Sequence, residues 1–180
     1  KFKFQNKKAI VYCGCMNTSR NIKFVIDIIA LVKKKHNDAI LLLVGGSGVE
    51  GTKEEFQNIR NYIKFKKLED DEVIMTGHID YNEIGNLLSE CTIGISPLYP
   101  YERFKVSTPS KLVEYLSVGL PSVANKEIFD QNEILTISKG GFAVDYNTKS
   151  FSDAISRLLD DRDEAFKMGN KGKKWIVNNR

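Results

Sequence analysis

The sequence predicts an α/β domain in which helices cover both faces of a doubly wound parallel sheet of about six strands. Short apolar runs alternate along the chain with longer segments whose apolar residues recur at helical spacing. The runs do not alternate with polar residues, which is typical of strands buried on both faces of a sheet. A length of 180 residues suits one core. We therefore expect a single domain over residues 1–180.

Most of the predicted strands end at a turn-forming residue. Strands are expected at residues 9–14, 39–44, 73–76, 91–95, 122–124 and 142–144. Helices are expected at residues 21–35, 53–66, 82–89 and 109–118, with two more beginning at Ser150 and Asp163. Segments 98–106 and 125–141 are expected to be irregular.

The composition is that of an ordinary globular protein, with 42% hydrophobic and 28% charged residues, which excludes a disordered or fibrous chain. The net charge of +4 is mild, so we expect an anionic ligand and no nucleic-acid partner. No apolar run could span a membrane and no signal peptide is visible, which favours a cytoplasmic location. The chain begins without Met and a helical pattern still runs near its end, so we expect a piece of a longer protein.

The three cysteines, Cys13, Cys15 and Cys91, do not form a disulfide framework because their number is odd. The Cys13-x-Cys15 pair lacks a second ligand pair, and both histidines fall outside any metal-ligand spacing. We therefore expect neither a metal nor another cofactor.

Residues 107–124, STPSKLVEYLSVGLPSVA, predict a helix that begins with a cap at Ser107 or Thr108 and has Pro109 in its first position. The start of a helix offers free N–H groups and a positive dipole end to a phosphate. We expect Lys111 to bind a diphosphate there and Glu114 to accept hydrogen bonds from sugar hydroxyls. The alternative is an exposed Lys–Glu pair on a capped amphipathic helix.

Ligands of doubly wound sheets bind beyond the carboxyl ends of the strands, near the switch in strand order. Gly14 and Cys15 follow the first predicted strand, His78 and Ile79 follow the third, and Leu98 follows the fourth. A base could lie against His78 and Ile79, although a single histidine is often incidental. Cys15 is expected to be a small turn residue, because no partner for a nucleophile is evident.

Arg20 follows the turn at Gly14 and could reach a phosphate at the same edge; the alternative is a surface arginine. Tyr99, Tyr101 and Phe104 could stack on a base, or else pack against one another within their loop. No Ser-His-Asp triad supports a hydrolase.

Residues 46–51, GSGVEG, match the dinucleotide-binding pattern G-x-G-x-x-G, with Glu69 and Asp70 about twenty residues on. A dehydrogenase is disfavoured because the motif follows the second predicted strand rather than the first, and because its acids precede their strand. We expect a tight strand-to-helix turn near the ligand.

Residues 111–121, KLVEYLSVGLP, resemble the K-x-x-E-Y-hydrophobic-x-x-G-x-P signature of one family, and segments 9–14, 41–45, 73–79 and 92–97 extend the likeness over nearly the whole chain. The family is the C-terminal, nucleotide-sugar donor-binding domain of GT-B retaining glycosyltransferases of group 1, family 4. The resemblance implies a Rossmann-like fold, one half of a GT-B enzyme. It implies that Glu114 binds the ribose, that residues from Thr108 through Ser110 to Leu112 line the phosphates and sugar, and that His78 and Ile79 lie by the base.

Two departures from the family pattern affect this site. The family often carries a second glutamate eight residues before the first, where this chain has Val106, and Glu102 is a candidate substitute. The family often carries an Arg and a Lys after the first strand, where this chain has Cys15 and Asn21. Arg20, alone or with Lys111, must therefore neutralise the diphosphate.

The resemblance implies a hexosyltransferase whose partners are a nucleotide-sugar donor, a missing N-terminal lobe and an acceptor of unknown kind. We expect the single domain to bind the donor but to transfer little sugar, without a metal. The expected location is cytoplasmic, and membrane association of the full-length protein through its other lobe, which is common for such enzymes, is an open alternative. The alternatives are a nucleotide-sugar epimerase of the same architecture and a non-catalytic nucleotide-binding or interaction module.

Overall fold

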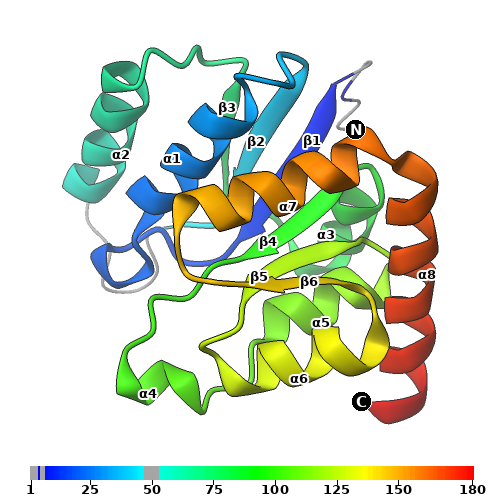
Figure 1. Ribbon diagram of the computed structural model, residues 1–180. Coiled ribbons are helices and arrows are strands. Elements are labelled where there is room, and N and C mark those ends of the chain that lie inside the picture. The colour runs from blue at the N-terminus through cyan, green and yellow to red at the C-terminus, as the bar shows by residue number, and fades with distance from the viewer. Residues whose placement is uncertain (1–3, 5–6, 47–52) are drawn as a thin grey trace.

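The computed structural model describes residues 4, 7–46 and 53–180, in which six parallel strands form one sheet in the order β3-β2-β1-β4-β5-β6 (Figure 1). The strands are β1 (Lys8–Cys13), β2 (Ala39–Val44), β3 (Val73–Gly77), β4 (Ile93–Ser96), β5 (Ser122–Asn125) and β6 (Gly141–Val144). The doubly wound parallel sheet predicted from the sequence is confirmed.

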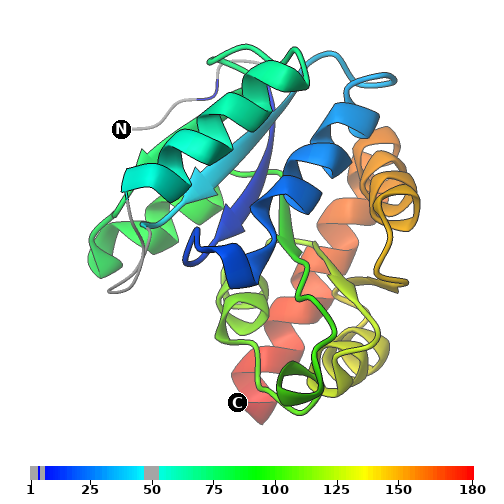
Figure 2. The same cartoon turned by 90° about the vertical axis from the view of Figure 1, so that its left-hand side faces the viewer.

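The helices lie in two layers, one on each face of the sheet (Figures 1 and 2). The described helices are η1 (Thr18–Arg20), α1 (Ile22–Val32), α2 (Lys53–Phe65), α3 (Tyr81–Ser89), α4 (Glu102–Lys105), α5 (Ser110–Ser117), α6 (Phe129–Ser138), α7 (Thr148–Asp160) and α8 (Arg162–Asn179). Helices α1, α2 and α7 share one apolar cluster with the sheet, whereas α3, α5 and α6 pack on the other face.

Alternate residues of each strand enter the two clusters, which is why the strands are continuously apolar. Ile10 and Tyr12 of β1 pack toward α1 and α7, whereas Val11 and Cys13 pack toward α3. All six residues of β2 are buried. Burial on both faces is the condition under which an uninterrupted apolar run is a strand.

The last two helices begin slightly earlier than predicted, because side-chain caps fix their starts. Asn147 accepts a hydrogen bond from the N–H of Ser150, so α7 begins at Thr148. Asp161 accepts one from the N–H of Glu164, so α8 begins at Arg162. Asn and Asp are favoured at such positions because they satisfy free N–H groups of the first turn.

Helix α6 occupies a segment that was expected to be irregular, and that expectation is wrong. Its buried side chains include the polar Gln131 and Ser138 beside Ile134 and Leu135. Polar residues on the buried face interrupt the apolar spacing by which an amphipathic helix is recognised. The four-residue helix α4 likewise lies within the expected loop 98–106.

Candidate functional site

A cavity of about 600 Å³ opens at the carboxyl ends of the strands, where the strand order switches between β1 and β4. Its walls come from the loops that follow β1, β2, β3 and β4, from the start of α3 and from the start of α5. The lining residues are Tyr12 to Cys15, Arg20, Val44 to Gly46, His78, Ile79, Tyr81, Ile84, Ile95 to Leu98, Phe104, Ser107 to Lys111, and Glu114.

The structure brings nearly all the predicted site residues to this one cavity. They are Gly14, Cys15, Arg20, His78, Ile79, Leu98, Thr108, Ser110, Lys111 and Glu114. Leu112 does not line it: its side chain is fully buried and packs with Leu116 and Ile134. The prediction that Leu112 lines the ligand site is therefore wrong for its side chain, which belongs to the core.

The start of α5 faces the cavity without a side-chain cap. Pro109 is the residue that precedes the helix, and no cap hydrogen bond forms there. The prediction that Ser107 or Thr108 caps this helix is wrong. The hydroxyl of Ser107 donates instead to the carbonyl of Phe104 at 2.8 Å. The N–H of Leu112 donates to the carbonyl of Pro109. The two N–H groups before it, of Ser110 and Lys111, lie at the open end of the helix dipole.

Lys111 and Glu114 form an ion pair on the cavity wall. The Nζ of Lys111 lies 3.3 Å from Oε1 of Glu114, and the two side chains are 40% and 28% exposed. The pair lies beside the buried apolar stripe of α5, which is formed by Leu112, Tyr115 and Leu116, rather than in it. A carboxylate with solvent-accessible oxygens retains lone pairs for hydroxyl groups of a ligand.

Tyr115 anchors α5 across the switch between β1 and β4. It is fully buried, and its hydroxyl accepts a 2.7 Å hydrogen bond from the N–H of Cys13 at the end of β1. Its ring lies against Gly94 of β4, where an added Cβ would come within 2.6 Å of ring atoms. Burial raises the pKa of Tyr115 well above its usual value, so the hydroxyl stays neutral. The sequence-based prediction did not assign a role to Tyr115 or to Gly94.

Arg20, from η1, stacks on an aromatic ring at the mouth of the cavity. Its guanidinium carbon lies 5.3 Å from the centroid of the Phe104 ring, and that of Arg103 lies 4.9 Å from the same centroid. The ion pairs of the described residues do not include Arg20. Within the part of the chain that the structure describes, its charge is therefore held at the cavity without a carboxylate to neutralise it.

The aromatic side chains of the loop after β4 pack mainly against one another. The ring centroids of Tyr99 and Tyr101 lie 4.4 Å apart, and Tyr99 also meets Tyr146 edge-on. Only Phe104 of the three predicted aromatics lines the cavity. Stacking of a base on Tyr99 or Tyr101 in this cavity is thus not supported.

The floor of the cavity is backbone from the ends of β1 and β2. The N–H of Gly14 donates to the carbonyl of Val44, and that of Gly45 donates to the carbonyl of Gly77, both at 2.9 Å. Gly45 has φ +127, and a Cβ there would lie 2.2 Å from the carbonyl oxygen of Gly14. The glycine turn after β2 thus reaches the cavity, while residues 47–51 of the G-x-G-x-x-G segment lie outside the described residues.

The loop after β3 supplies His78 and Ile79, as predicted, together with Tyr81, which sequence reasoning missed. Tyr81 is 83% exposed although it borders the cavity. An exposed aromatic ring at the edge of a ligand-sized cavity is accessible to a ligand.

The substitute acid proposed from the sequence does not reach the cavity. Glu102 is exposed and pairs with Lys105 at 2.6 Å. Val106 is also exposed and does not line the cavity. Among the residues that the structure describes, Glu114 is the carboxylate on the cavity wall.

The described residues show no metal site and no long apolar helix. They contain no group of three or more His, Cys, Asp and Glu side chains that could hold a metal ion. None of their helices combines the length and apolarity needed to cross a bilayer. The three cysteines are free, with Cys15 exposed on the cavity and Cys13 buried.

A parallel sheet in this order, with a cavity at its switch point, defines the Rossmann-like class of α/β domains. Within this class the chain belongs to the glycosyl transferases group 1 family, whose model matches residues 1–175. The group 1 glycosyltransferase family predicted from the signature at residues 111–121 is confirmed. None of the curated protein sequences is significantly similar to the chain.

Solved glycosyltransferase structures share the fold at low sequence identity. The C-terminal domain of a group 1 family protein (LpcC) from Francisella tularensis has a TM-score of 0.78 and 16% identity, over 96% of this chain and 85% of that chain. Anabaena HepE in complex with UDP-glucose has a TM-score of 0.82 and 16% identity, over 97% and 45%. Staphylococcus aureus TarM in a complex with UDP has a TM-score of 0.79 and 20% identity, over 98% of this chain and 33% of that chain.

The likeness to LpcC covers most of a C-terminal domain, which agrees with the domain type predicted from the sequence. The present chain spans less than half the length of the HepE and TarM chains that it matches.

Proposed function

We propose that this domain binds a nucleoside-diphosphate sugar and, with a second lobe, transfers the sugar to an acceptor. One observation carries the proposal: two cations, Arg20 and Lys111, the uncapped start of α5 and the carboxylate of Glu114 face a single cavity at the switch point. Cations and free N–H groups suit a diphosphate, and a carboxylate suits the hydroxyls of a ribose.

The proposed chemistry uses these groups on the leaving diphosphate. Transfer breaks the bond between the anomeric carbon and the diphosphate oxygen, and negative charge develops on that oxygen. Lys111, Arg20 and the N–H groups of Ser110 and Lys111 belong to the lining of the cavity in which this charge would form, so they would stabilise the transition state more than the ground state. Because protein cations neutralise the charge, the proposal requires no metal.

The finer features of the proposal rest on family resemblance. They are retention of anomeric configuration, transfer of a hexose, and a donor site completed by an N-terminal lobe that brings the acceptor. The HepE and TarM complexes contain UDP or UDP-glucose, which makes UDP the first ligand to test. We propose that this domain alone binds the donor and transfers little or no sugar.

Calorimetric titration with UDP, compared with uridine, tests the roles of the two α5 side chains. Lys111→Ala should weaken UDP binding by about tenfold or more, since a charge-assisted hydrogen bond contributes about 1.5–3 kcal/mol. It should affect uridine much less. Glu114→Gln should weaken both ligands, because both carry the ribose.

Lys149→Ala is the matched control, because Lys149 also pairs with an acid on its own helix but lies outside the cavity. Equal losses for UDP and uridine in Lys111→Ala would exclude a contact between Lys111 and the diphosphate. Unchanged affinities in Glu114→Gln would remove Glu114 from the ribose site.

Thermal-shift measurements with UDP, GDP, ADP and NAD separate the proposal from its alternatives. Stabilisation by a nucleoside diphosphate is expected, because a ligand that binds only the folded state raises Tm. Stabilisation by NAD alone would favour a dehydrogenase, and no stabilisation would favour an interaction module. An epimerase would require acid and base groups at the sugar, and conversion of a UDP-sugar without an acceptor would reveal it.

A further inference from the structure

The excess of basic over acidic side chains lies at the end of the chain, in α8 and Arg180. Residues 165–180 contain five of the 27 basic side chains and none of the 23 acidic ones. The remainder of the chain therefore has one more acidic than basic side chain, so the net charge of +4 arises from residues 165–180, which comprise most of α8 and Arg180. Only the first turn of α8 carries acids, Asp163 and Glu164.

Four lysines of α8 lie on its outer side. Lys167, Lys171, Lys173 and Lys174 are exposed, and none of them belongs to an ion pair among the described residues. Spacings of four and three residues place Lys167, Lys171 and Lys174 on one face of the helix. Arg180 differs, because it pairs with Asp130 at 2.6 Å.

Two large apolar side chains accompany these lysines. Phe166 is 71% exposed and Val177 is 70% exposed. They are eleven residues apart, which is close to three helical turns, so they share one flank of the lysine face. Single exposed apolar residues are common, but a pair beside four unpaired cations forms an amphipathic surface.

The inner side of α8 is held firmly against the domain, so the outer side is a fixed platform. Ala165, Gly169, Gly172 and Ile176 are buried. A Cβ on Gly169 would lie 2.0 Å from the carbonyl oxygen of Gly119, which shows how closely the helix backbone approaches the turn after α5. The lysine face therefore cannot turn inward without unpacking the helix.

We propose that the outer face of α8, formed by Phe166, Lys167, Lys171, Lys173, Lys174 and Val177, docks on a bilayer surface that contains anionic phospholipid. Lysines interact with the lipid phosphates and carboxylates, while the phenyl ring and the valine enter the boundary between headgroups and acyl chains. A nucleic acid would use the lysines but would gain nothing from Phe166 and Val177. The combination of charge and apolar surface therefore favours a membrane.

Docking through α8 leaves the cavity open. Helix α8 lies on the right of the molecule in Figure 1, whereas η1 and α4, which supply or adjoin cavity residues, lie on the left. A domain bound through α8 would therefore still exchange a soluble ligand. The inference does not depend on which ligand the cavity takes.

Flotation of the 180-residue chain with vesicles tests the proposal. Binding is expected to phosphatidylcholine vesicles that contain phosphatidylserine, to fall as salt is raised, and to be weak on phosphatidylcholine alone. Each lysine near such a surface contributes about fivefold to partitioning. Lys171→Gln with Lys174→Gln should therefore lower partitioning by roughly 25-fold.

The matched control is Lys34→Gln with Lys35→Gln, which removes the same charge from exposed lysines after α1 and should change partitioning little. Phe166→Ala should lower partitioning by about threefold or more, since a partly inserted phenyl ring is lost. UDP affinity, if the cavity binds UDP, should be the same in all three variants.

Two outcomes would overturn the proposal. One is equal vesicle binding by the α8 and α1 lysine variants. The other is salt-dependent binding to a random DNA duplex that depends on the α8 lysines but not on Phe166, combined with no binding to anionic vesicles. The second outcome would assign the face to nucleic acid.

Discussion

Tyr115 is the residue that links the core to the cavity. Its ring fills the space above Gly94, and its hydroxyl satisfies the N–H of Cys13 at the point where β1 ends. Four residues before it, Lys111 points its charge to the cavity from the same helix. Buried and cavity-lining side chains on one short helix thus act together: the tyrosine fixes the position from which Lys111 and Glu114 line the cavity.

Replacing Tyr115 by Phe tests this link at the scale of one atom. The variant keeps the ring but leaves the buried N–H of Cys13 without a partner, which should lower the free energy of unfolding by about 1–3 kcal/mol. Urea denaturation would measure the change. Tyr81→Phe removes the same atom from an exposed ring and should have almost no effect, so equal losses in the two variants would contradict the role of the Tyr115 hydroxyl.

Helix α5 is the element on which the site depends, and its docking requires a residue without a side chain at position 94. The backbone of β4 and the ring of Tyr115 are in contact there, and any Cβ would push the helix away from the sheet. Packed interiors do not absorb such a group without strain. The start of α5 would then move relative to the loops after β1 and β3.

Gly94→Ala should therefore lower both the free energy of unfolding, by about 1–3 kcal/mol, and the affinity for nucleotide. Gly85→Ala is a control for which the free energy of unfolding is expected to rise rather than fall. Gly85 lies within α3, where an added Cβ would meet nothing within 4 Å, so the change should stabilise the domain by about 0.5–1 kcal/mol. Urea denaturation and calorimetry of both variants would check this, and a stable Gly94→Ala variant with unchanged nucleotide affinity would refute the role of Gly94.

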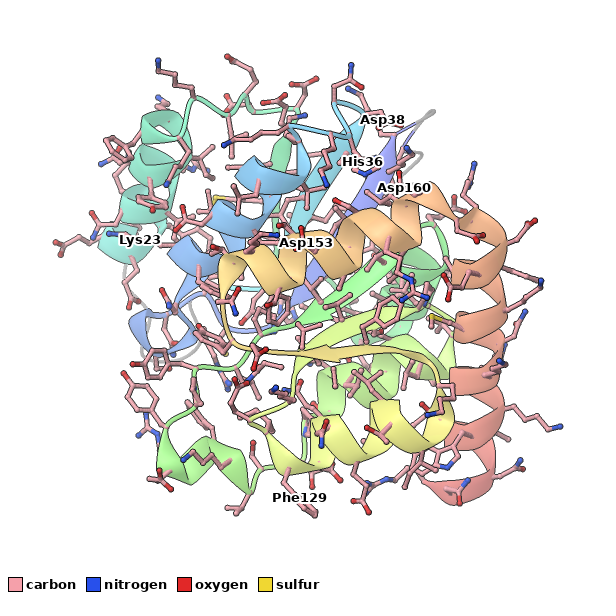
Figure 3. All side chains as sticks on the ribbon, viewed as in Figure 1. Lys23, His36, Asp38, Phe129, Asp153 and Asp160 are labelled. Atoms are coloured by element: carbon pink, nitrogen blue, oxygen red, sulfur yellow. The ribbon has the colours of Figure 1, made fainter. Side chains whose placement is uncertain are left out.

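At the scale of the whole molecule, the two ends of the parallel strands differ: one end carries the cavity and the other is packed against helices. The carboxyl ends of the strands carry the cavity, while the opposite ends of β1 and β2 approach the end of α1 and α7. There His36 is buried near Asp160, its Nε2 3.6 Å from the carboxylate (Figure 3). The lysine face of α8 forms a third region on the side of the domain.

Burial of several weak acids in this core makes the stability of the whole domain sensitive to alkali. Burial raises the pKa of the Cys13 thiol from about 9 to about 11, and that of Cys91 to about 12. The unfolded chain therefore releases these protons at lower pH than the folded one. Stability that is fully present below pH 9 should be lost as the pH rises toward 11 and 12.

Urea denaturation at a series of pH values would measure this loss. The free energy of unfolding should fall between pH 9 and 11. The free energy of unfolding of Cys91→Ala should fall less steeply with pH than that of the parent chain, because one of the titrating groups is gone. Parallel curves for the two proteins would show that Cys91 does not contribute.

The parallel sheet could be predicted because both of its faces are buried, so that its strands are apolar throughout, as in β2. The α6 helix could not, because Gln131 and Ser138 are buried by neighbours that are distant in sequence. The clustering of Gly14, His78, Leu98 and Lys111 at one edge followed from the rule that parallel strands end together.

The sequence by itself determined the strand-helix alternation, the family, and most of the residues that face the cavity, since these depend on local periodicity and on a short signature. Only the tertiary structure decided the role of Tyr115 opposite Gly94, the inward position of Leu112, and the distance of Glu102 from the cavity. Each of these is a contact between segments, and its outcome is set by how closely the packed layers approach. No local pattern along the chain encodes that distance.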